Sequence, residues 1–96
     1  MRSVVLQTHQ AVVVAWLVLP GQVIRAHVHP TGQDSWTVLS GEGEYFLDRD
    51  GNTATIRTGD IAVAQAGEVH GVRNVGDVPL EFVSIVSPAD AGFEAL

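Results

Sequence analysis

The chain has 96 residues, of which 46% are hydrophobic, and a formal net charge of −6 at pH 7. It contains no cysteine and no lysine, which excludes disulfides, thiolate metal clusters and Schiff-base chemistry. Its arginines are scattered along an acidic chain, so we expect no nucleic-acid binding, because a phosphate backbone needs a continuous basic surface.

Length and apolar content predict one domain over residues 1–96, with a small core. The longest apolar run is far shorter than the roughly 20 residues that span a bilayer, so we expect no membrane segment. Nothing at the N-terminus resembles a signal peptide, and the chain lacks cysteine. We therefore expect a cytoplasmic protein.

Short β-type runs separated by glycine-rich turns recur along the chain, and no helical repeat of apolar residues is seen. We predict strands near residues 3–8, 11–19, 22–29, 34–40, 43–48, 53–57, 60–65, 69–75 and 80–87. This spacing favours an all-β fold, an antiparallel sandwich or barrel. We expect the tail, residues 88–96, to form a short helical turn or to cover one end.

The run Ala11–Leu19 is apolar at positions that would face both sides of a strand. A sheet with one solvated face should alternate apolar and polar residues. Covering by the tail or by a neighbouring loop is one explanation. We favour a subunit interface, since a small chain gains core by pairing, and we therefore expect a homodimer.

The next strand ends in two histidines. Regular alternation puts Val23, Arg25, His27 and His29 on one face. Two imidazoles at positions i and i+2 can share one ion, and Pro30 keeps His29 extended.

After a Pro-Thr-Gly turn, Asp34 opens the following strand and brings a carboxylate back beside the histidines, as in two-histidine, one-carboxylate metal sites. Gln33 is the alternative oxygen donor. Because neighbouring strand residues face opposite sides, only one of these two side chains should point inward.

His70 lies in a later β-type run, and with it the chain resembles the cupin superfamily. The first cupin motif, G-x5-H-x-H-x3or4-E-x6-G, is matched at Gly21, His27, His29, Asp34 and Gly41, with aspartate in place of glutamate. The second, G-x5-P-x-G-x2-H-x3-N, is matched at Gly59, Gly67, His70 and Asn74, with Gln65 in place of proline.

The resemblance implies a small antiparallel jelly-roll β-barrel. Inside it, His27, His29 and His70, together with the acidic position, would bind one divalent transition metal. Imidazole and carboxylate ligands suit iron, manganese, nickel, zinc or copper.

Candidate substrate-handling residues are fewer. Arg25 would meet an anionic substrate through its guanidinium or form a salt bridge at the barrel rim. Tyr45 and Glu44 are candidate acid–base residues, of which only one can face inward because they are adjacent. We expect Trp36 and Val38, which share the face of Asp34, to line the cavity.

Two function classes follow. The first is a metal-dependent enzyme, a dioxygenase, lyase or isomerase, acting on a small molecule. The scarcity of acid–base residues favours chemistry performed by the metal over proton transfer. The second is a non-catalytic module that binds or senses a small, sugar-like ligand.

Overall fold

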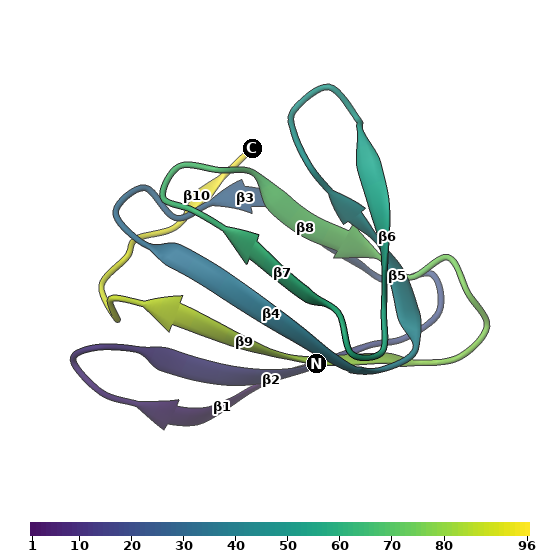
Figure 1. The fold of residues 1–96 in the computed structure, drawn as a ribbon, viewed down its shortest axis with the longest axis horizontal. Helices are drawn as coiled ribbons and strands as arrows, with labels where there is room; N and C mark the ends of the chain where they lie inside the picture. The colour runs from purple at the N-terminus through teal and green to yellow at the C-terminus, as the bar shows by residue number, and fades with distance from the viewer.

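The computed structural model describes all 96 residues and shows two five-stranded antiparallel sheets (Figure 1). In one sheet, here called sheet A, the order is β1 (Arg2–Gln7), β2 (Val12–Val18), β9 (Leu80–Ser87), β4 (Gln33–Ser40) and β7 (Ile61–Ala64). In sheet B the order is β10 (Glu94–Ala95), β3 (Val23–Val28), β8 (His70–Arg73), β5 (Glu42–Phe46) and β6 (Thr53–Arg57). The predicted all-β jelly roll is confirmed. None of the chain's segments forms a helix with the length and hydrophobicity needed to span a bilayer.

All nine predicted strands are present, as β1 to β9. The helical turn that we considered for the tail is wrong, and the other expectation, that the tail covers one end, is confirmed. Glu94 and Ala95 form β10, which pairs with Val28 and His27 of β3. A strand pairs with the backbone N–H and C=O groups along the edge of β3, whereas an isolated helical turn would leave these groups without partners.

A β-bulge interrupts β3. In the pairing with β8, Ile24 lies opposite Val72 but His27 lies opposite His70, so β3 contains one extra residue between the two pairs. Ile24 packs against the core, whereas Val23 is exposed. The prediction that Val23 shares the face of His27 is therefore wrong, because the bulge reverses the alternation between them.

Strand β2 lies between β1 and β9, and its two faces differ. Val14 and Val18 point into the molecule and are buried. Val13, Ala15 and Leu17, on the opposite face, are half-buried. The apolar run therefore supplies the interior through one face and leaves part of the other to solvent.

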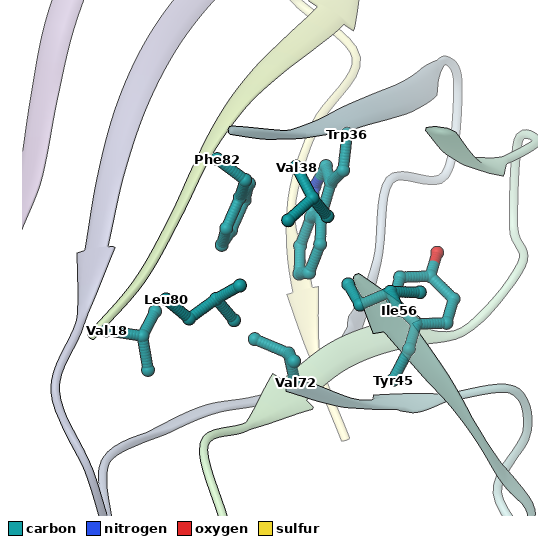
Figure 2. Close-up of a cluster of buried hydrophobic side chains, with 8 residues drawn as sticks. All are labelled: Val18, Trp36, Val38, Tyr45, Ile56, Val72, Leu80 and Phe82. Carbon is teal, nitrogen blue, oxygen red and sulfur yellow. The ribbon is translucent and has the colours of Figure 1, made fainter. Parts of the chain in front are cut away.

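The core occupies one end of the space between the sheets (Figure 2). Trp36 stacks on Phe82 with ring centroids 4.2 Å apart and meets Tyr45 edge-on at 5.3 Å. Val38 packs in this cluster and does not line the cavity, contrary to expectation. We call this cluster the packed half; its buried residues are Val18, Trp36, Val38, Tyr45, Ile56, Val72, Leu80 and Phe82.

Candidate metal centre

Four potential metal ligands meet at the opposite end of the barrel. They come from the end of β3, the residue that follows it, the start of β4 and the start of β8. One ligand atom of each lies within 4.8 Å of all the others. These are His27, His29, Asp34 and His70, here called the cluster; all are buried except His29, which is half-buried.

Two of the histidines are oriented by their own strands. The Nδ1 atom of His27 lies 2.7 Å from the carbonyl oxygen of Arg25, at the bulge. That of His70 lies 3.3 Å from the carbonyl oxygen of Glu68. Because a carbonyl only accepts, each Nδ1 donates a proton, and a neutral ring then has its lone pair on Nε2. Both Nε2 atoms are thus set to bind a metal.

The third histidine is oriented by the tail. His29 Nδ1 lies 2.6 Å from the carbonyl oxygen of Gly92, a residue 63 positions away. Thr31 anchors this segment, because its backbone N–H and its hydroxyl both donate to the carbonyl of Ala91, each at 2.9 Å. Phe93 then lies over His27, with ring centroids 5.0 Å apart.

The Asp34 carboxylate faces the Nε2 atoms of two histidines. Its Oδ2 lies 3.0 Å from Nε2 of His70 and 3.4 Å from Nε2 of His29. The Oδ1 of Asp34 and the Nε2 of His29 are buried without a hydrogen-bond partner. With Nδ1 protons directed at carbonyls, neutral imidazoles present only acceptors to the carboxylate, an arrangement that a cation would satisfy. The donor set therefore fits a divalent transition metal.

The pKa directions of Asp34 and His27 agree with this role. Burial alone would raise the pKa of Asp34, but the side chains of His29, His70 and Trp36 that face its carboxylate outweigh burial and lower the pKa to about 2. Burial lowers the pKa of His27. The facing Asp34 carboxylate raises the pKa of His29, so this imidazole must lose its proton when a metal binds. Asp34 is thus ionised and His27 neutral at neutral pH, the forms in which each binds a metal.

Gln33 lies outside the cluster. It is exposed at the start of β4, opposite Ser87, whereas Asp34 is 4% exposed and points inward. The single methylene of Asp34 is long enough to bring its Oδ2 against His70.

The cupin-motif asparagine, Asn74, has a structural role here. Its side-chain amide donates to the carbonyl oxygens of Val18 at 2.9 Å and Val78 at 2.8 Å. Its own side-chain oxygen accepts from the backbone N–H of Gly76. Asn74 is 1% exposed and holds the chain between β8 and β9.

The two candidate acid–base residues are not in the cavity. Tyr45 is buried in the packed half, and burial raises the pKa of its hydroxyl. Glu44 alternates with Tyr45 and lies opposite Arg73 in sheet B. Neither lines the cavity, so the predicted acid–base role has no geometric basis.

A cavity of about 800 Å³ opens beside the cluster. Arg25 lines it, as predicted, and Trp36 forms part of its wall. Sequence reasoning missed Arg2 and the tail residues 89–93, which also line it. The only signal for the tail was the expectation that it covers one end, and Arg2 had none, because its position follows from the pairing of β1 with β2.

Comparison with known proteins agrees with this architecture. A family model described as a cupin domain matches residues 14–86. An uncharacterized conserved protein with a double-stranded β-helix domain from Klebsiella pneumoniae is 53% identical and superposes with a TM-score of 0.95, covering 99% of this chain and 82% of that one. A predicted oxalate decarboxylase from Thermotoga maritima is 26% identical, with a TM-score of 0.76 over 82% of this chain and 68% of that one.

Among curated proteins, one described as an oxalate-binding protein from Thermotoga maritima is 33% identical over 67 residues. The match covers 70% of this chain and 54% of that protein, so the chain spans about half the length of this relative.

Proposed function

The chain belongs to the cupin domain family, and on this premise we propose that it binds one divalent transition metal through the cluster and, at that metal, a small carboxylate ligand. The observation that carries the proposal is that several hydrogen-bond acceptor atoms face one another with no donor between them. The buried Oδ2 of Asp34 lies against the Nε2 atoms of His70 and His29 while the Nδ1 protons are directed at carbonyls.

A carboxylate is supported by two independent features. Two of the similar proteins are described as an oxalate-binding protein and a predicted oxalate decarboxylase. Beside the cluster, Arg25 brings a guanidinium to the cavity, and this group recognises carboxylates through paired hydrogen bonds.

Four protein ligands leave coordination positions free on an octahedral ion, and a metal bound there would act as a Lewis acid toward the carboxylate. An enzyme of the dioxygenase, lyase or isomerase type is the first candidate. A binding module without turnover is the second. It is favoured by the cavity, whose ionisable lining residues outside the cluster are only Arg2, Arg25 and Asp90.

Metal analysis tests the proposal. Protein purified without chelator should contain about one equivalent of a transition metal, and His70→Ala should lose it because one ligand is missing. His9→Ala is the matched control, because His9 is exposed and lies outside the cluster. Native protein that carries no transition metal and takes none up would end the proposal. Oxalate consumption and oxygen uptake by the loaded protein then separate the enzyme from the binding module.

We also propose that a second copy of the chain covers the outer face of sheet A. The register places Leu6, Val13, Ile85, Ser35 and Val63 in one row across the five strands of this sheet, and all of them except Ser35 are apolar. Leu6, Ile85 and Val63 are 56%, 42% and 51% exposed, so the row presents apolar side chains to solvent on both sides of Ser35.

Light scattering after size exclusion should give a dimer, and Ile85→Glu should convert it to a monomer. Leu47→Glu, at a leucine of similar exposure outside sheet A, should leave the dimer intact. A native protein that is monomeric at micromolar concentration would overturn this arrangement.

A further inference from the structure

The cavity is much larger than oxalate requires. Its volume of about 800 Å³ lies in the range of roughly 300–1,000 Å³ that accommodates drug-sized ligands. Oxalate consists of carboxylates joined directly and would fill only the part next to the cluster. A ligand that uses the rest of the cavity needs a body beyond its carboxylate.

The walls next to the cluster are apolar. Val86 lies directly opposite Asp34 in the β4–β9 pairing, which puts their Cβ atoms roughly 5 Å apart, so apolar surface begins one strand away from the carboxylate. Val12, opposite Val86 on β2, and Val14 extend this surface. From the tail, Phe93 also lines the cavity, and this residue is 66% exposed. An apolar ligand body would cover these groups.

Arg25 is placed to bind the charged end of such a ligand. It precedes His27 by two residues and lines the cavity, and its guanidinium forms no hydrogen bond or ion pair within the chain. The other arginine of the lining, Arg2, lies over the Trp16 ring at 5.9 Å. Asp90, the acidic lining residue outside the cluster, is exposed.

We propose that the ligand is a carboxylate with an aromatic or branched apolar body. Its carboxylate lies between the cluster and Arg25, and its body lies against the valines of β2 and β9 and against Phe93. The position of the carboxylate rests on the proposed metal site, whereas the apolar body rests on the cavity walls alone.

Three probes separate the contribution of the ligand's carboxylate from that of its apolar body. Pyruvate and phenylpyruvate share the same 2-oxo carboxylate and differ by a phenyl ring, and oxalate has no apolar body. Calorimetric titration of the metal-loaded protein should show phenylpyruvate binding about tenfold or more tightly than pyruvate, because the ring loses contact with water. The affinity for phenylpyruvate should also exceed the affinity for oxalate. Equal affinity for phenylpyruvate and pyruvate, or strongest binding of oxalate, would overturn the inference.

Two variants locate the ligand. Arg25→Met keeps an unbranched apolar stem and removes the guanidinium, and it should weaken the binding of pyruvate and of phenylpyruvate by the same factor, about tenfold. Arg49→Met, at an exposed arginine outside the cavity, is the control. Val86→Phe fills the space beside the apolar wall and should weaken the binding of phenylpyruvate but not that of pyruvate. Val12→Phe replaces this variant if Val86→Phe does not fold. Unchanged affinities in folded Arg25→Met would exclude this residue as the anchor.

Metal content, measured before each titration, separates the two proposals. Protein that takes up no metal refutes the metal site. The ratio of phenylpyruvate to pyruvate affinity in the same metal-free protein still tests the apolar wall, and a ratio near one refutes the ligand class.

Discussion

The two ends of the barrel use the same strands differently. Toward one end of the sheet A strands, Val18 of β2 faces Leu80 of β9, and aromatic side chains fill the space around them. Toward the other end, Val12 faces Val86, Asp34 lies beside them, and the space stays open. Alternation decides which side chains point inward in both halves, but side-chain size decides whether the interior is filled or available to a ligand.

Trp36 joins the packed half to this hollow half. Its ring stacks on Phe82 and meets the ring of His70 edge-on, with centroids 5.7 Å apart. It is 2% exposed but forms part of the cavity wall. The comparison therefore predicts that stability resides mainly on one side of Trp36 and metal binding on the other.

The largest expected effect is in the packed half. Leu80 is fully buried, and Leu80→Ala should lower the free energy of unfolding by about 2–5 kcal/mol, because it removes apolar contacts and leaves a cavity. Urea denaturation measures the loss, and Leu39→Ala, at a 55% exposed leucine, should change little. The metal stoichiometry of folded Leu80→Ala should equal that of the native protein; loss of metal would show that the halves are not separate.

Asn74→Ala sharpens the comparison because Asn74 belongs to a cupin motif and yet its side chain forms hydrogen bonds only with backbone groups. Removing its amide leaves the buried carbonyl of Val18 without this donor, at a cost of about 1–3 kcal/mol. Urea denaturation should show the loss, while metal affinity measured by competition with a chelator should stay within about twofold. A large fall in affinity would place this residue functionally with the cluster.

Gly92→Ala should act on the hollow half. Gly92 has φ near +80°, and an added Cβ would lie 3.3 Å from Cδ of Pro30, so the carbonyl that orients His29 must shift. Loss of such a support typically lowers metal affinity by about 10–100-fold. Gly51→Ala is the matched control, because its φ is +86° with no atom within 4 Å of the added Cβ. Equal metal affinities in the two variants would contradict the role of the tail.

The smallest expected effect is a pH dependence of metal binding. Because Asp34 raises the pKa of His29 above its ordinary value of 6.5, this imidazole stays protonated to a higher pH and competes with the metal there. Affinity should therefore fall as pH decreases from above 6.5, by at most about tenfold per pH unit for each proton displaced. Chelator competition between pH 5 and 8 measures the profile. An affinity that is constant over this range would show that no histidine of the cluster takes up a proton there.

Local pattern sufficed for much of the fold and for the ligand types. Glycine turns between short β-type runs predicted the nine strands, because turn residues and period-two alternation act over a few neighbouring positions. The same alternation brought His27 and His29 together and allowed only one of Gln33 and Asp34 to point inward. Bringing in His70 required the resemblance to a known family, since no local rule joins residues so far apart in the chain.

Tertiary structure alone decided the rest. The bulge in β3 follows from pairing with β8, the inward position of Tyr45 from the packing of β5, and the support of His29 from a tail residue 63 positions away. These features depend on which segments become neighbours when the two sheets close, and on how completely their side chains fill the space between them. A one-dimensional pattern contains neither, because register and packing are properties of contacts between distant parts of the chain.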